Sequence, residues 1–268
     1  MIRYDIYTET NIGNARSVNE DNFCCNGIIN DNLCKSFSFQ TSTEEQVSSF
    51  AVFDGMGGME CGEKAAYIAA KLMKEYISIS KVAGISFPAI HYLDEANEKI
   101  CQWMKSHNAS SGSTAVIVSI FDKEAKITNL GDSRAYLLRD SKLYQLSEDH
   151  TQSALFRKIQ KEAGAISIME PENLKNILTQ YLGVFADEFK LEPSRKILKI
   201  KNRDIILLCS DGLTGMLSDE RICNILGEDA ELGQKGKKLV TEALKSGGED
   251  NITVILIEAT VAGEDMRC

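Results

Sequence analysis

Residues 50–58 read Phe-Ala-Val-Phe-Asp-Gly-Met-Gly-Gly, and the fold assignment starts from this stretch. The apolar run from Ser49 to Phe53 predicts a buried strand that stops at Asp54. A glycine-rich turn follows, and apolar residues at three-and-four spacing then predict a helix over Glu60 to Ile77. A carboxylate at the end of a buried strand is costly unless it is paired or binds a cation, so Asp54 is a candidate metal ligand.

Three more acidic sites lie beside strand ends, in the segments Gly131-Asp132, Asp211-Gly212 and Glu249-Asp250. If these strand ends meet at one rim of a sheet, they offer the carboxylate and carbonyl oxygens that Mg²⁺ and Mn²⁺ prefer. Each aspartate taken alone is also explained by a turn or a helix cap. The repetition of the pattern in four places favours a metal site.

Further segments rich in Val, Ile and Leu predict the other strands: Thr114 to Phe121, Arg134 to Leu138, Arg195 to Ile200, Asp204 to Cys209 and Ile252 to Glu258. Helical spacing recurs over Ala89 to Met104, Asp219 to Leu226 (with Ser218 as its cap) and Glu231 to Leu244. Strands and helices do not alternate strictly, which argues against a doubly wound parallel sheet. The pattern favours an α+β fold with antiparallel sheets and helices packed outside them.

Two connections carry local predictions. Lys201-Asn202-Arg203 fits the turn of a hairpin between the strands that end at Ile200 and begin at Asp204, and Lys126 to Tyr144 is interpreted as an antiparallel meander. The stretch from Gln152 to Leu182 interrupts the series of strands and predicts a surface excursion with two short helices.

The composition predicts one globular domain over residues 1–268, with 43% hydrophobic residues and no Gly/Ser/Pro-rich linker. The net charge is −9 and no basic patch is present, which argues against a nucleic-acid partner. No apolar run approaches the length needed to cross a membrane. The 8 cysteines are scattered without a CxxC pair, which argues against a zinc site, and the N-terminus has no export signal, so we expect a cytoplasmic protein.

The glycine-rich run does not match a nucleotide-binding loop. In Gly57 to Lys64, Glu63 intervenes before the lysine and Ala65 follows it, whereas a P-loop requires Gly-Lys and then Ser or Thr. Near the N-terminus, Arg16 precedes Glu20 and Asp21. This segment is either a solvated loop or a phosphate clamp, because the guanidinium donates two parallel hydrogen bonds.

Eight motifs in order resemble the protein phosphatase 2C family, the metal-dependent protein phosphatases, from about Asn11 to the strand after Asp250, and their spacing resembles a compact bacterial member. They are Arg16-x-x-Asn19-Glu20-Asp21, Asp54-Gly55-Met-Gly-Gly, Ser111-Gly-Ser-Thr-Ala, Gly131-Asp-Ser-Arg, Asp149-His150-Thr, Leu178-Thr-Gln-Tyr-Leu-Gly183, Cys209-Ser-Asp211-Gly-Leu-Thr and Glu249-Asp250-Asn-Ile-Thr.

The resemblance implies a four-layer α-β-β-α sandwich with two central antiparallel sheets and a pair of Mn²⁺ or Mg²⁺ ions at one edge. It implies that Asp54 bridges the two ions, that the Gly55 carbonyl binds one, and that Asp211 and Asp250 complete the other shell. Supporting roles fall to Glu20 near the second ion, to Asp21 through waters, and to Asp132, which with Asp211 would hold a weaker third ion. Arg16 would grip the phosphate.

The implied activity is hydrolysis of phosphoserine and phosphothreonine in proteins, by a hydroxide that bridges the two ions. Arg16, Asp54 and Asp211 are the expected catalytic residues. Animal relatives carry a histidine in place of Met56, proposed as the acid for the leaving group, and Met56 cannot donate a proton. A water on a metal ion or His150 are the alternatives, although a structural role is favoured for His150.

Selectivity is expected in the flap at about residues 152–182, which corresponds to the surface excursion. Two other hypotheses remain: a catalytically silent regulatory module, and a small-molecule phosphomonoesterase on the same fold. The presence of Asp54, Asp211 and Asp250 argues against the first. The expected partners are phosphoprotein substrates and a serine/threonine kinase, with a monomer as the default state.

Overall fold

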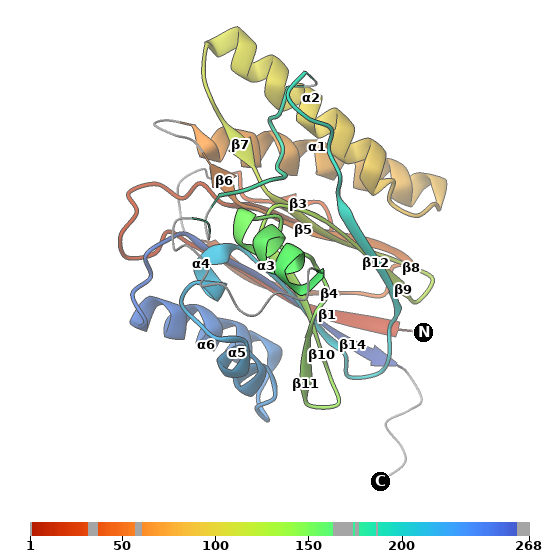
Figure 1. The fold of residues 1–268 in the computed structure, drawn as a ribbon. Helices are drawn as coiled ribbons and strands as arrows, with labels where there is room; N and C mark the ends of the chain where they lie inside the picture. Colours follow the sequence, from red (N-terminus) through yellow and green to blue (C-terminus); the bar gives the residue numbers. More distant parts are fainter. Residues whose placement is uncertain are drawn as a thin grey trace.

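Two antiparallel sheets of six strands lie face to face in this computed structural model, which describes residues 2–31, 37–56, 61–162, 174, 177–185 and 187–261 (Figure 1). The first sheet has the order β11 (Lys142–Gln145), β10 (Arg134–Arg139), β13 (Ile205–Cys209), β14 (Ile252–Val261), β1 (Ile2–Asn11) and β4 (Phe37–Thr43). The second has the order β12 (Ser194–Lys199), β9 (Glu124–Leu130), β8 (Ala115–Phe121), β5 (Val47–Phe53), β2 (Asn22–Cys25) and β3 (Ile28–Ile29). A short ribbon pairs β6 (Gly55–Met56) with β7 (Gly112–Ser113).

Helices cover the outer face of each sheet (Figure 1). The long helices α1 (Gly62–Ala83) and α2 (Ala89–His107) pack on the second sheet, while α5 (Asp219–Leu226) and α6 (Leu232–Lys245) pack on the first. The single-turn helix α4 (Asp211–Thr214) follows β13, and α3 (Gln152–Glu162) lies between β11 and β12 in the chain. Among the described helices, none combines the length and the apolarity that crossing a bilayer would require.

Three apolar layers result from this stacking and confirm the predicted four-layer α-β-β-α sandwich. Strand β5 shows how one sequence serves two of them. Phe50 and Val52 point into the layer between the sheets, whereas Ala51 and Phe53 pack in the layer under α1 and α2. Because both faces of the strand are buried, it is apolar throughout, and the sequence shows an unbroken run.

Most predicted elements are confirmed within a few residues. The Ser218 hydroxyl caps α5 by accepting a hydrogen bond from the Arg221 amide at 3.2 Å. Helix α1 begins at Gly62, and the preceding residues 57–60 lie outside the described part of the chain. In the predicted flap, the first short helix is α3, while the prediction of a second short helix falls largely on residues 163–173 and 175–176, which lie outside the described residues.

The predicted hairpin and meander are wrong. Strand β12 pairs with β9 in the second sheet and β13 pairs with β10 and β14 in the first, so the turn at residues 201–203 carries the chain from one sheet to the other. The predicted meander is broken in the same way, because β9 and β10 lie in different sheets. A short polar turn can join two neighbouring strands of one sheet or carry the chain into the other sheet. The pairing is decided by which apolar layer each strand completes.

A buried ion pair stabilises the crossover after β12. Asp204 is 1% exposed, and its carboxylate accepts hydrogen bonds from the Arg139 Nε at 2.7 Å and the Lys201 amide at 2.7 Å. The Arg139 Nη2 also donates to the Lys199 carbonyl at 2.8 Å. Arg139 therefore ties the end of β10 in the first sheet to the end of β12 in the second.

We expect Asp204→Asn to destabilise the protein by about 2–3 kcal/mol, since it removes a buried charge partner from Arg139 and preserves the shape of the side chain. Urea denaturation at a constant metal-ion concentration measures the change. The exposed Asp94→Asn in α2 is the matched control and should change stability by less than about 0.5 kcal/mol. Equal stability of the two variants would contradict the role of this ion pair.

Candidate active site

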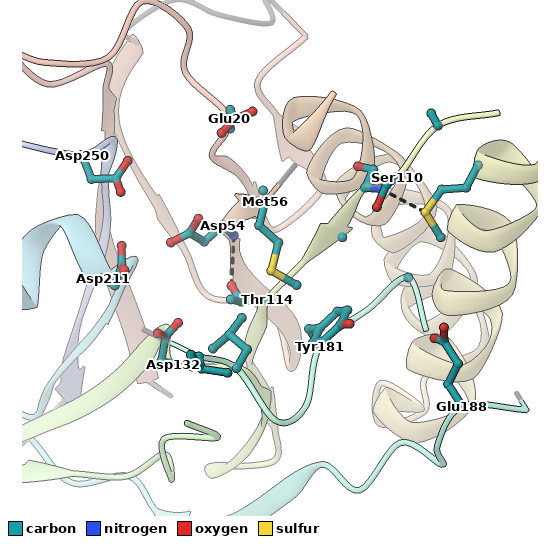
Figure 2. Close-up of a pocket in the computed structure, with 18 of the residues that line it drawn as sticks. Glu20, Asp54, Met56, Ser110, Thr114, Asp132, Tyr181, Glu188, Asp211 and Asp250 are labelled. Atoms are coloured by element: carbon teal, nitrogen blue, oxygen red, sulfur yellow. Dashed lines mark hydrogen bonds between the residues drawn. The ribbon is translucent and has the colours of Figure 1, made fainter. Parts of the chain in front are cut away.

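The predicted site residues gather at one edge of the sandwich, around a cavity of about 800 Å³ (Figure 2). Asp54 directly follows β5, Asp132 lies in the turn after β9, Asp211 begins α4 after β13, and Asp250 precedes β14. Figure 2 shows Asp54, Asp132, Asp211 and Asp250 together on one side of the cavity. Seven of the predicted residues line it: Arg16, Glu20, Asp54, Gly55, Asp132, Asp211 and Asp250. Asp21 is buried behind them and does not line the cavity.

Thr114 holds two of the acidic turns together. Its hydroxyl accepts a hydrogen bond from the Asp54 amide at 3.0 Å, and its own amide donates to the Asp54 carbonyl at 2.8 Å. The same hydroxyl also forms a hydrogen bond with the Ser133 hydroxyl, at 2.7 Å. Because Ser133 follows Asp132, Thr114 fixes the Asp54 turn against the Asp132 turn. Thr114 therefore has a structural role at the base of the site.

Asp21 anchors a buried network beneath the cavity. It is 4% exposed, and its Oδ2 accepts hydrogen bonds from the Ser210 and Thr253 hydroxyls, both at 2.7 Å. Its Oδ1 is buried and has no hydrogen-bond partner within the described part of the chain. A buried carboxylate oxygen without a donor is costly, so this atom has unused capacity to accept a hydrogen bond from water or to bind a cation.

Asn251 is the residue that the sequence reasoning left without a role. Its Oδ1 accepts from the Glu20 amide at 2.8 Å, and its Nδ2 donates to the carbonyls of Ile12 at 2.9 Å and Val18 at 3.0 Å. These bonds hold the loop of Arg16 and Glu20 against the turn of Asp250. The Arg16 Nη2 completes the contact by donating to the Asp250 Oδ2 at 2.7 Å.

The glycines of two Asp-Gly pairs are required by close packing of backbone. A Cβ at Gly55 would lie 2.3 Å from the Gly62 carbonyl oxygen and 2.4 Å from that of Glu20. A Cβ at Gly212 would lie 2.0 Å from the Asn251 carbonyl oxygen. The backbone segments that carry Asp54, Glu20, Asp211 and Asp250 therefore approach one another more closely than any side chain would permit.

Burial raises the pKa of Asp54 well above its usual range, and the surrounding charges of Asp21, Asp211, Asp132 and Asp250 raise it further. Burial and the Asp211 charge raise the pKa of Asp132 to about 7. Burial also raises the pKa of Asp21 to about 8, although its two hydroxyl donors oppose the shift. The carboxylates are thus close enough to repel one another.

A divalent cation fits this donor set. The donors are hard oxygens, Asp21 has an oxygen without a partner, and Arg16 is the one cation among the described residues that line the cavity. No three His, Cys, Asp or Glu side chains within the described residues already form a metal-binding group. Waters or backbone carbonyls would therefore complete any coordination shell, as Mg²⁺ and Mn²⁺ commonly require.

Three other motif residues lie near the acidic cluster. The Arg134 Nη2 forms an ion pair with the Asp149 Oδ2 at 2.6 Å. His150 does not line the cavity, and its Nδ1 accepts a hydrogen bond from the Gly131 amide at 3.2 Å. Burial lowers the pKa of His150, which agrees with this neutral role. Met56 lines the cavity beside Asp54 (Figure 2).

Comparison with known proteins identifies the family. The model of protein phosphatase 2C matches residues 7–171, more than half of the chain. The chain belongs to the protein phosphatase 2C family. The match covers the segments of Arg16, Glu20, Asp21, Asp54 and Asp132.

Members of the protein phosphatase 2C family and their structures resemble the chain over most of its length. A serine/threonine phosphatase, stp, of Listeria welshimeri is 36% identical over 215 residues, which is 77% of this chain and 82% of that protein. The structure of the Streptococcus agalactiae serine/threonine phosphatase has a TM-score of 0.76 at 26% identity and covers 95% of this chain and 98% of its own. The catalytic domain of the phosphatase PstP, solved with 2 manganese ions, has a TM-score of 0.72 at 23% identity. It covers 97% of this chain and 100% of its own.

The raised pKa values predict how the stability of the metal-free protein depends on pH. A carboxyl group whose pKa is higher in the folded state than its value of about 3.9 in the unfolded chain favours the folded state most at low pH, and this contribution is lost as pH rises from the unfolded value to the folded value. For Asp132 and Asp21 these values are about 7 and about 8. After treatment with a chelator, the melting temperature should therefore fall between about pH 5 and pH 8 and level off above that range.

The variant Asp132→Asn should show a smaller fall over this range than the wild type, and the exposed Asp94→Asn should show the same fall as the wild type. Differential scanning calorimetry in EDTA measures both. A melting temperature of the metal-free protein that rises from pH 5 to pH 8 would contradict the described crowding of carboxylates.

Proposed function

We propose that this chain is a metal-dependent phosphoprotein phosphatase that hydrolyses phosphoserine and phosphothreonine. The observation that carries the proposal is the convergence of four aspartates from separate turns on one cavity, in a chain of the protein phosphatase 2C family. The names of the relatives support the reaction: several are serine/threonine phosphatases, including stp of Listeria and PhpP of Streptococcus pneumoniae.

We propose that two Mn²⁺ or Mg²⁺ ions bind among these oxygens, as two manganese ions do in the PstP structure. The ligands would be Asp54, the Gly55 carbonyl, Asp211 and Asp250, with Glu20 and Asp21 in supporting positions and Asp132 with Asp211 at a weaker third position. When bound, such ions supply Lewis-acid catalysis and a water of lowered pKa near the phosphorus. Their charge would also offset the repulsion that raises the pKa of Asp54.

Arg16 is placed to bind the substrate phosphate. Its side chain is 49% exposed at the cavity and keeps its guanidinium against Asp250 at 2.7 Å. The hydrogen bond to Asp250, with that residue's charge, raises the pKa of Arg16, so the guanidinium stays charged. A guanidinium held at one end by a carboxylate still has other N–H groups to donate to phosphate oxygens.

The proton for the leaving alkoxide does not come from Met56, which has none to give. His150 lies outside the cavity lining, and no histidine or lysine is among the described residues that form it. We propose that water in the cavity delivers this proton.

The two other hypotheses have less support. A silent regulatory module would not need the complete set of acidic residues, and all of them are present here. A small-molecule phosphomonoesterase could use the same metal ions, but the similar proteins are named as serine/threonine or protein phosphatases.

Four wider proposals concern the whole chain. We propose a single catalytic domain over residues 1–268, supported by the pairing of β1 with β14, which places the first and last described strands side by side in one sheet. The cysteines that the structure describes are free thiols, which supports a reducing compartment such as the cytoplasm. We propose that the enzyme acts as a monomer and that it opposes a serine/threonine kinase, since its expected substrates are the products of such kinases.

Phosphate release from a phosphothreonine peptide should require added Mn²⁺ or Mg²⁺ and should stop on chelation. The variant Asp211→Asn should lose roughly a hundredfold or more of kcat/KM, because it removes a charged ligand from the expected metal site. Calorimetric titration with Mn²⁺ provides a second readout and should show weaker binding to the variant. A folded wild-type protein without activity at any Mn²⁺ or Mg²⁺ concentration would disprove the proposed function.

The variant Arg16→Ala should raise KM for the phosphopeptide about tenfold or more while changing Mn²⁺ affinity much less, because Arg16 is expected to contact phosphate and only borders the metal site. Steady-state kinetics and a Mn²⁺ titration of the same preparation separate the two effects. Arg16→Lys, which keeps the charge and loses the planar fork, should fall between the wild type and Arg16→Ala. A loss of metal affinity as large as the loss of substrate affinity would refute the assignment.

A further inference from the structure

The cavity continues beyond the acidic residues into a second half. This half, here called the side chamber, is lined by Met104 and Ser110 from the end of α2 and the loop after it, and by Tyr181, Phe185 and Glu188 from the loop before β12. Figure 2 shows Tyr181 and Glu188 on the side of the cavity opposite Asp211 and Asp250. The reaction assigned to the metal site does not use these residues.

The side chamber is held in shape by hydrogen bonds from its walls to α2 and β7. Asn97 of α2 accepts from the amides of Gly183 at 2.7 Å and Val184 at 2.9 Å, and its Nδ2 donates to the Val184 carbonyl at 2.9 Å. Ser113 and Leu182 exchange two backbone hydrogen bonds at 3.0 and 2.8 Å. The wall that carries Tyr181 and Phe185 is therefore fixed relative to the ribbon that carries Gly55.

An apolar wall runs from the metal site into the side chamber. A Cβ at Gly112 would lie 2.8 Å from the Met56 Cε and 3.2 Å from the Tyr181 Cδ2, so both side chains lie against the same glycine. The Tyr181 ring is supported from behind by Phe189, edge to face, with the ring centres 5.8 Å apart. Met104 also lines the cavity, and its sulfur accepts a hydrogen bond from the Ser111 amide at 3.1 Å.

A carboxylate lies at the far end of this wall. Glu188 is exposed and is bonded to Phe185 twice: the Glu188 amide donates to the Phe185 carbonyl at 2.9 Å, and the Phe185 amide donates to the Glu188 Oε2 at 3.3 Å. Among the described residues that line the cavity, the one cation is Arg16, which lies against Asp250. Lys105 holds its ammonium group 4.9 Å from the centre of the Phe185 ring but does not line the cavity.

We propose that the side chamber binds a lysine or arginine side chain of the substrate, close in sequence to the phosphorylated residue. This inference rests on the proposed function and adds the substrate class to it. The alkyl stem of such a side chain packs along Tyr181 and Met104, and its charged end reaches Glu188. Long basic side chains have this combination of an apolar stem and a charged end, and aromatic rings also attract cations.

The test uses a set of phosphothreonine peptides in which one arginine is moved through the flanking positions of an otherwise alanine- and glycine-based sequence. At the best position, arginine is then replaced by methionine and by glutamate. For the wild-type enzyme with Mn²⁺, we expect kcat/KM for the arginine peptide to exceed that for the methionine peptide about two- to fivefold, and the glutamate peptide to be poorest.

The preference is measured as the ratio of kcat/KM for two peptides within one enzyme preparation, so a general loss of activity cancels. In Glu188→Gln the arginine-to-methionine ratio should fall to about one, and in Glu188→Lys the glutamate peptide should become better than the arginine peptide. Glu192→Gln removes the same charge from the same loop at a residue that does not line the cavity, and should keep the wild-type ratio.

The outcomes separate this inference from the proposed function. Turnover of every peptide at the same rate by the wild type, or an arginine preference that survives in Glu188→Gln, would overturn the side-chamber inference and leave the phosphatase activity established. Lack of metal-dependent turnover of any peptide would overturn both. Reversal of the preference in Glu188→Lys would support the inference directly.

Discussion

The repulsion between carboxylates at one edge of the sandwich is the constraint on which the site depends. Asp54 is buried among the charges of Asp21, Asp132, Asp211 and Asp250, and without cations this arrangement opposes folding. The fold maintains it by placing the aspartates at the ends of strands that are themselves fixed in two buried sheets. Burial of the three apolar layers therefore stabilises the fold enough to hold these carboxylates together against their mutual repulsion.

The contacts that hold the cluster are mostly neutral. Thr114 binds the Asp54 turn, Asn251 binds the Glu20 loop, and Ser210 and Thr253 donate to Asp21. Neutral donors orient backbone and carboxylates without neutralising them, so the negative charge stays available to cations. Arg16 is the exception, and it lies at the exposed side of the cavity, where a phosphate would arrive.

The sequence predicted the site better than it predicted the pairing of strands. Strands buried on both faces, such as β5 and β13, appear in the sequence as unbroken apolar runs. The motifs also located every acidic residue that lines the cavity outside the side chamber. The polar edge strand β4 gave no such signal. The hairpin at residues 201–203 was predicted wrongly because turn residues do not reveal which sheet the next strand joins. Asn251 was missed as an anchor since its partner Glu20 lies 231 residues away in the chain.

Met56 links the two halves of the cavity, and its identity matters to both. Its backbone belongs to the ribbon directly after Asp54, and its side chain packs beside Gly112 next to Tyr181. A histidine at this place would bring a titratable proton to the metal side, whereas methionine extends the apolar wall toward the side chamber. The absence of a proton donor at residue 56 and the continuity of the wall are two consequences of one residue. If water supplies the leaving-group proton, as we propose, residue 56 is free to extend the apolar wall toward the substrate-binding half of the cavity.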